Sequence, residues 1–141
     1  TDTDGNLVLV PKNSNSADFV PGISAVQNIT DEEVVSASWS RIKNVVTVNF
    51  NILVTFTDPD TMGRLDLALP FTAADQDTIS GNFLGVSPLE PASNRHQPGY
   101  VVGNGGTTHA SLWVYDASSG QIRTLMGSFT YITDQPIDGP L

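Results

Sequence analysis

VVTVNFNILVTFT, residues 45–57, has the clearest structural pattern in the chain. Its apolar residues occupy every second position, and the positions between them carry mostly Thr and Asn. A β-strand has a side-chain period of two, whereas a helix has a period of 3.6. The stretch therefore predicts a strand with one buried face. That face would carry Val46, Val48, Phe50, Ile52, Val54 and Phe56.

The flanking sequence predicts two further strands. Residues 35–41 place Val, Ala, Trp and Arg on one face, and Lys43-Asn44 would form a tight turn into the central strand. Downstream, an Asp-Pro-Asp turn at residues 58–60 precedes alternating leucines at residues 65–69. We expect these three strands to form a meander, with Trp39 as a core anchor.

The rest of the chain has the texture of short strands and turns. Residues 110–115 and 122–132 alternate again and predict a second hairpin, whereas residues 72–99 fit either a long functional loop or a short, interrupted strand. The best helix signal, at residues 30–33, predicts at most one helical turn.

These patterns predict an all-β single domain of roughly seven to nine short strands, an antiparallel β-sandwich or jelly roll. The sandwich should span residues 31–141, after an extended N-terminal arm or peripheral strand within residues 1–30. Because the sequence begins at Thr1 rather than Met, without a signal-peptide pattern, we expect a fragment of a longer protein.

Composition excludes several classes of function. The 141-residue chain has no cysteine, which rules out disulfide scaffolds, thiolate metal sites and cysteine nucleophiles. Its formal charge of −9 argues against nucleic acid as a partner, because binding to a phosphate backbone needs a basic patch. No apolar run approaches the roughly 20 residues of a transmembrane helix, so we expect no membrane insertion.

Catalytic and metal motifs are weak. Neither a nucleophile elbow nor a phosphate-binding loop is present, and an acid–base role for Glu90 or His96 rests on position in a turn-rich region alone. The acids Asp58, Asp60 and Asp66 suit either calcium or a solvated turn, and the turn is the commoner use of Asp. We therefore expect a non-enzymatic protein, with no cofactor and no metal.

Residues 110–115 also point to a binding surface. Trp113 shares one face with Ser111 and Tyr115, and the opposite face carries Leu112 and Val114. Because both faces carry large residues, one of them must meet a second sheet, a ligand or another subunit. The candidate ligand- or receptor-binding residues are Trp113, Tyr115, Arg95, His96, Tyr100 and His109.

ASWSRIKNVVTV, residues 37–48, resembles a hairpin signature of bacteriophage virion proteins found in tail-fibre tips, receptor-binding heads and spikes. Their pattern is an aromatic residue followed by Ser/Thr-Arg-Ile/Val-Gly-Asn/Asp-Val-Val-Thr-Val, and Lys43 replaces the Gly. The strand ending at Pro70 resembles their Leu-Pro segment, and GSFTYI, residues 127–132, resembles their closing strand. The resemblance covers residues 34–133.

This resemblance implies a β-sandwich that forms a homotrimeric knob on the surface of a virion, in contact with other virion proteins. The implied role is non-enzymatic attachment to a host-surface glycan or protein receptor. We expect the contacts to come from loops between residues 72 and 109. The alternative is a carbohydrate-binding module or adhesin-like domain of a cellular protein, which predicts a monomer and a sugar-binding Trp113.

Overall fold

The structure is a computed structural model that describes residues 14–58, 61–75, 78–86, 97–104, 106–116 and 122–136. Nine strands and no helix occur in these residues. The strands are β1 (Ser14–Asp18), β2 (Ile23–Gln27), β3 (Ile29–Ile42), β4 (Val45–Phe56), β5 (Thr61–Ala68), β6 (Thr78–Val86), β7 (Gln97–Asn104), β8 (His109–Asp116) and β9 (Ile122–Ile132).

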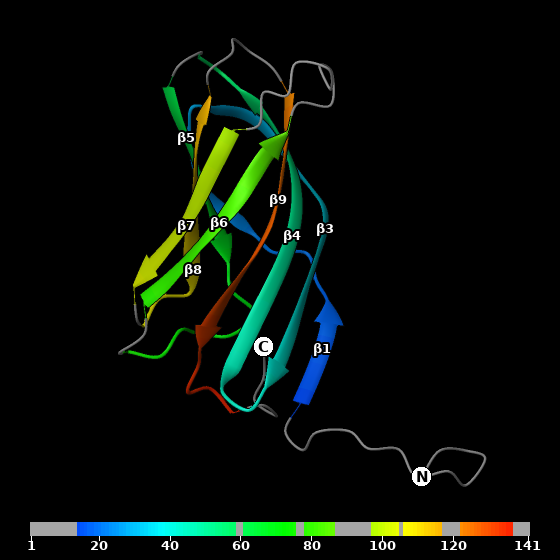
Figure 1. The fold of residues 1–141 in the computed structure, drawn as a ribbon, viewed down its shortest axis with the longest axis vertical. Helices are drawn as coiled ribbons and strands as arrows, with labels where there is room; N and C mark the ends of the chain where they lie inside the picture. The colour runs from blue at the N-terminus through cyan, green and yellow to red at the C-terminus, as the bar shows by residue number, and fades with distance from the viewer. Residues whose placement is uncertain are drawn as a thin grey trace, which may run out of the picture.

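The strands form one antiparallel ladder in the order β1-β3-β4-β9-β6-β7-β8-β5-β2. The ladder folds into two layers, one of four strands (β1, β3, β4, β9) and one of five (β6, β7, β8, β5, β2) (Figure 1). The predicted all-β, antiparallel sandwich is thereby confirmed. The outermost strands of the ladder, β1 and β2, come from the first 30 residues of the chain.

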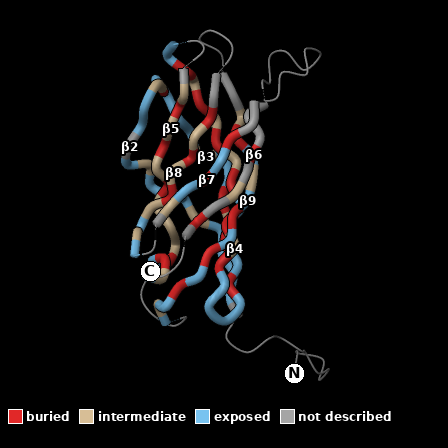
Figure 2. The backbone as a smooth tube through the Cα atoms, turned by 60° about the vertical axis from the view of Figure 1, so that its left-hand side comes forward, coloured by how far each residue is buried: buried red, intermediate tan, exposed pale blue. Residues whose placement is uncertain are grey.

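The core lies between the layers, and burial alternates along the strands (Figure 2). The predicted inner face of β4 is buried from Val46 to Phe56, and Trp39 on β3 is buried with it. Burying each large apolar side chain contributes roughly 1.5–3 kcal/mol, so this strand is a major source of stability. The alternation in residues 45–57 was therefore a correct guide to the core.

Two predicted strand pairings are wrong. β4 lies between β3 and β9, whereas β5 crosses to the other layer and pairs with β8 and β2, so the three strands form no meander. Likewise, β8 and β9 form no hairpin, because β8 lies between β7 and β5 and β9 lies between β4 and β6. Side-chain alternation specifies which face of a strand is buried, but it does not specify the neighbouring strand.

β3 differs from its prediction at two points. Residues 30–33 are extended, not helical, because they lie in a strand paired with β4. A register shift lies between Val34, which is opposite Ile52, and Ser36, which is opposite Asn51. This β-bulge turns Val34 toward the core and leaves Val35 56% exposed, whereas strict alternation predicted Val35 on the buried face.

The turn between β3 and β4 is the predicted two-residue connection, with Ile42 opposite Val45. Lys43 adopts a φ of 54°, a left-handed conformation that favours glycine. Arg41, only 3% exposed, donates from Nε to the Lys43 carbonyl (2.6 Å) and from Nη2 to the Gln135 carbonyl (2.5 Å). The arginine of the hairpin motif is thus a structural tie between the turn and the C-terminal segment.

The segment expected to be a loop or an interrupted strand contains β6 and β7 in its described part; residues 87–96 lie outside that part. Before β6, the chain is fixed across one end of the sandwich. Tyr131 donates its hydroxyl proton to the Phe71 carbonyl (2.7 Å), and Ala73 N–H bonds to the Thr107 carbonyl (3.0 Å). Ala74 N–H bonds to the Ile132 carbonyl (2.8 Å). These bonds make residues 71–74 a closure of the core rather than a free binding loop.

Within the described residues, no helix is long and apolar enough to cross a membrane.

Candidate functional site

The outer face of the five-stranded layer gathers large side chains from three neighbouring strands. Trp113 on β8 lies opposite Arg64 on β5 and also opposite Tyr100 on β7. Residues directly opposite on neighbouring strands point to the same face, so the three side chains form one row across the sheet. We call this row the aromatic rib.

In the aromatic rib, the Trp113 ring contacts both Tyr100 and Arg64. The Trp113 and Tyr100 rings are nearly parallel, at 13°, with centroids 6.5 Å apart. The Arg64 guanidinium carbon lies 5.3 Å from the Trp113 centroid. Arg64 and Tyr100 come from the strands on either side of β8, so Trp113 supports both, and Tyr100, at 44% exposure, is the open end of the row. Offset aromatic pairs and cation–π contacts each contribute roughly 0.5–1.5 kcal/mol at such sites.

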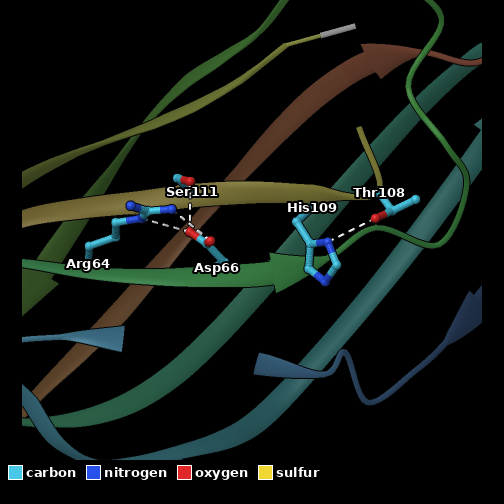
Figure 3. A network of polar contacts seen from close by, with 5 residues as sticks. All are labelled: Arg64, Asp66, Thr108, His109 and Ser111. Carbon is cyan, nitrogen blue, oxygen red and sulfur yellow. Dashed lines mark hydrogen bonds and ion pairs between the residues drawn. The ribbon is translucent and has the colours of Figure 1, made fainter. Parts of the chain in front are cut away.

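The next row contains a fixed carboxylate (Figure 3). Asp66 Oδ1 accepts from Arg64 Nε (2.9 Å) and Ser111 Oγ (2.7 Å), and Asp66 Oδ2 accepts from Arg64 Nη2 (2.8 Å). Burial raises the pKa of Asp66, but the hydrogen bonds from Arg64 and Ser111 and the charge of Arg64 outweigh it, so this pKa lies below its ordinary value. Asp66 is therefore an ionised acceptor at neutral pH.

A shallow hollow of about 380 Å³ lies beside this carboxylate. It is lined by residues of β5, β7 and β8 and of the turn between β7 and β8, namely Asp66, Gly103, Gly106, Thr107, Thr108, His109 and Ser111. Gly106 has a φ of +78° and donates its N–H to the Ala73 carbonyl (2.9 Å), which fixes the turn. Thr108 Oγ1 and His109 Nδ1 lie 2.9 Å apart, in hydrogen-bond contact (Figure 3). The hollow thus offers hydroxyl, imidazole and carboxylate groups.

The structure brings three of the six candidate binding residues to this face. Trp113 and Tyr100 are in the aromatic rib, and His109 lies four residues before Trp113 on β8, at the hollow. The backbone of Tyr115 pairs with Met62, but its side chain lies outside the described part of the structure. Arg95 and His96 lie outside the described residues altogether.

Sequence reasoning did not name Arg64, and it considered Asp66 only for calcium or a solvated turn and Ser111 only as a neighbour of Trp113 on one face. The signal for Ser111 was present, because it shares the parity of Trp113 in one strand. Arg64 and Asp66 flank Leu65, a buried residue, so their outward direction followed from alternation as well. Their contacts with β8 could not be predicted from the sequence, because neither strand alone specifies the β5–β8 pairing.

The described residues contain no group of three His, Cys, Asp or Glu side chains that could hold a metal ion. Of the acids considered for calcium, Asp58 follows β4 and Asp66 is on the outer face of β5, held by Arg64, whereas Asp60 lies outside the described residues. The Asp58 backbone is bonded on both sides to the Asn28 side chain, through Asp58 N–H to Asn28 Oδ1 (2.7 Å) and Asn28 Nδ2 to the Asp58 carbonyl (3.1 Å). These two hydrogen bonds hold the turn after β4 against the Asn28 side chain.

Comparison of the chain with protein-family models, with curated proteins and with solved structures finds no match. The geometry of the protein's own surface is therefore the basis for its proposed function.

Proposed function

We propose that the protein is a non-enzymatic attachment domain of a bacteriophage virion appendage, which binds a host-surface receptor through the outer face of its five-stranded layer. The observation that supports this proposal is the aromatic rib. Tyr100 is exposed on a rigid sheet and is held from one side by Trp113, which is itself held by Arg64. Rigid, partly exposed aromatic and arginine side chains are the residues that most often dominate binding energy.

The proposal modifies the expected position of the contacts. Loops between residues 72 and 109 were the expected contact region; in the described part of that region, residues 71–74 close the core and the exposed Tyr100 lies on a strand. A binding group on a strand is held more precisely than one on a loop, because its neighbours are fixed by the ladder. The receptor-binding surface we propose therefore consists of β5, β7 and β8, with only the β7–β8 turn contributed by a loop.

Binding to cells tests the attachment role. The fluorescently labelled chain would be applied to a panel of bacterial strains that differ in surface polysaccharide and outer-surface proteins. We expect saturable binding to some strains, and a loss of at least tenfold in affinity for Tyr100→Ala. Met126→Ala is the matched control, because Met126 is equally exposed but lies on the four-stranded layer. Absence of binding to every strain, or equal loss in both variants, would overturn the proposal.

A trimeric assembly at the virion surface, in contact with other virion proteins, is the second part of the proposal. Its support is a row of exposed aliphatic residues, Ile42, Val45 and Ile132, which lie opposite one another across β3, β4 and β9. Adjacent exposed β-branched residues of this kind are typical of a surface that is covered in an assembly. Light scattering after size exclusion should give three times 15.0 kDa; the mass of one chain would contradict the trimer.

A carbohydrate-binding module of a cellular protein is the second candidate. The observation that favours it is the polar hollow next to the aromatic rib, an arrangement that suits a sugar in any protein. A monomer that binds polysaccharide but no intact bacterium would support this candidate over the virion appendage.

A further inference from the structure

The hollow beside Asp66 has the chemistry of a site for a hydroxyl-rich ligand. Its walls present the Thr108 hydroxyl, the His109 imidazole and the Asp66 carboxylate. Hydroxyl groups of a ligand can donate to a carboxylate and accept from an imidazole or a hydroxyl. A volume of about 380 Å³ is within the range of small-ligand sites.

Asp66 is set up as the acceptor of this site. Its side chain is 14% exposed, and three hydrogen bonds from Arg64 and Ser111 hold it in one orientation. A carboxylate has about four acceptor positions, so Asp66 Oδ2, which receives the single bond from Arg64 Nη2, keeps capacity for a ligand hydroxyl. A pre-positioned charged acceptor also forms the stronger class of hydrogen bond.

The charge of the surroundings favours a neutral ligand. Arg64, the cation at this face, is already paired with Asp66 in two parallel bonds and lies against the Trp113 ring. The whole chain carries a formal charge of −9. Among the described residues of this face, an anionic ligand would thus meet an ionised carboxylate and a repulsive field, with no unpaired arginine to offset them.

The spacing of the groups favours more than one sugar ring. Trp113 and His109 are four residues apart on β8, a separation of roughly 14 Å at about 3.4 Å per residue. The hollow lies at the His109 end and the aromatic rib at the Trp113 end, on the same face of the strand. A single sugar ring fits the hollow alone, whereas a short chain of rings reaches from the hollow to Tyr100.

We infer that the outer face of the five-stranded layer binds a neutral oligosaccharide, with one ring in the hollow donating hydroxyl protons to Asp66 and a second ring against Tyr100. This inference rests on the proposed attachment function, and it names the class of receptor. Ser111 is a positioning residue in this site, because it acts through its hydrogen bond to Asp66.

The test uses defined sugars. The whole chain would be applied to an array of neutral di- to tetrasaccharides built from glucose, galactose, mannose and rhamnose, together with versions in which one ring is a uronic acid. Affinities for the best neutral oligosaccharide and for its constituent monosaccharide would then be measured by calorimetry. We expect the oligosaccharide to bind at least tenfold more tightly than both the monosaccharide and the acidic version.

Variants separate the two ends of the site. Asp66→Asn and Thr108→Ala should each weaken oligosaccharide binding, Asp66→Asn by about tenfold, and Tyr100→Ala should reduce the affinity to that of the monosaccharide. Thr130→Ala removes an exposed hydroxyl that is bonded to Thr47 on the other layer, and it should leave the oligosaccharide affinity unchanged. Melting temperatures would confirm that each variant is folded, and Thr108→Ala keeps the test valid if Asp66→Asn unfolds.

The outcomes distinguish this inference from the proposed function. If intact cells bind in a manner that depends on Tyr100 but no sugar on the array binds, the attachment role stands and the saccharide inference is overturned. Tighter binding of the acidic versions, or full affinity in both hollow variants, also overturns the inference. If neither cells nor sugars bind, the proposed function fails as well.

Discussion

The two layers of the sandwich present different large side chains on their outer faces. In the four-stranded layer, the inward positions of β4 are filled by large apolar residues from Val46 to Phe56, and the outward positions of β3, β4 and β9 are mostly Ser, Thr and Asn, with aliphatic residues such as Ile132 among them. In the five-stranded layer, buried leucines and valines share the inward face with Gly63 and Gly99, whereas Arg64, Trp113 and Tyr100 point outward.

The inward glycines make room for rings. A Cβ atom at Gly99 would lie 2.2 Å from the Phe83 ring, and one at Gly63 would lie 2.3 Å from the Phe56 ring. Gly63 and Phe56 come from different layers, so a ring of the four-stranded layer packs directly on glycine backbone of the five-stranded layer, whereas Gly99 and Phe83 are cross-strand partners within one layer. The core is complete without the outward aromatic residues of the five-stranded layer. Their presence on that face needs another explanation, and ligand binding supplies one.

Gly63→Val should cost the most stability, because it removes this fit between the layers. The new side chain must displace the Phe56 ring, so we expect a loss of about 3 kcal/mol in the free energy of unfolding. Urea denaturation measures it. Gly22→Ala is the matched control, since a Cβ there meets only Ala68 at 4.0 Å, and it should stay within about 0.5 kcal/mol of the wild type. Equal stability of both variants would show that the Phe56 ring can move away from residue 63 at no cost.

Trp113→Ala tests whether the outward aromatic residues also stabilise the sheet. The variant loses the Tyr100 stacking and the Arg64 contact together, and we expect a loss of about 2 kcal/mol. Met126→Ala, on the outer face of the other layer, should change stability by no more than about 0.5 kcal/mol. Thermal and urea unfolding of the pair would measure this difference. Equal losses would show that Trp113 contributes no more to the stability of the fold than an ordinary exposed residue.

Lys43→Gly should stabilise the hairpin end of the four-stranded layer. A lysine at a φ of 54° is strained relative to glycine, by roughly 1 kcal/mol, and the carbonyl that accepts from Arg41 is unchanged by the substitution. We expect a gain of about 1 kcal/mol in urea denaturation. A loss of stability would mean that the greater freedom of glycine in the unfolded chain outweighs the relief of strain.

Asp66→Asn should alter the pH dependence of stability on the five-stranded layer. The pKa of Asp66 is lower in the folded chain than its ordinary value of 3.8, so ionised Asp66 stabilises the fold above that value. This stabilisation is lost as the pH falls through the lower, folded pKa. The free energy of unfolding, measured between pH 7 and pH 2, should therefore decrease less steeply in acid for Asp66→Asn than for the wild type. Parallel curves would contradict the assigned Arg64 and Ser111 contacts.

Local sequence patterns predicted the strands well and their partners poorly. The prediction for Val35 failed because a β-bulge, which no alternation pattern reveals, shifts the register of β3 between Val34 and Ser36. The helical turn expected at residues 30–33 failed because pairing with β4 outweighed a weak capping signal. For the candidate site, alternation grouped Trp113 with Ser111 on one face but left open which face points outward, and the contact of Trp113 with Arg64 required the β5–β8 pairing.

Side-chain alternation within single strands was enough to predict the all-β class, the buried face of β4 and the core position of Trp39. The strand order, the bulge in β3 and the contact of Asp66 with Ser111 arise only when the strands pair in the folded chain. Strand order depends on which strand faces, far apart in the sequence, bury the most apolar surface against one another. The position of glycines in a neighbouring strand determines where aromatic rings can pack. That is a property of the folded whole, which no single segment carries.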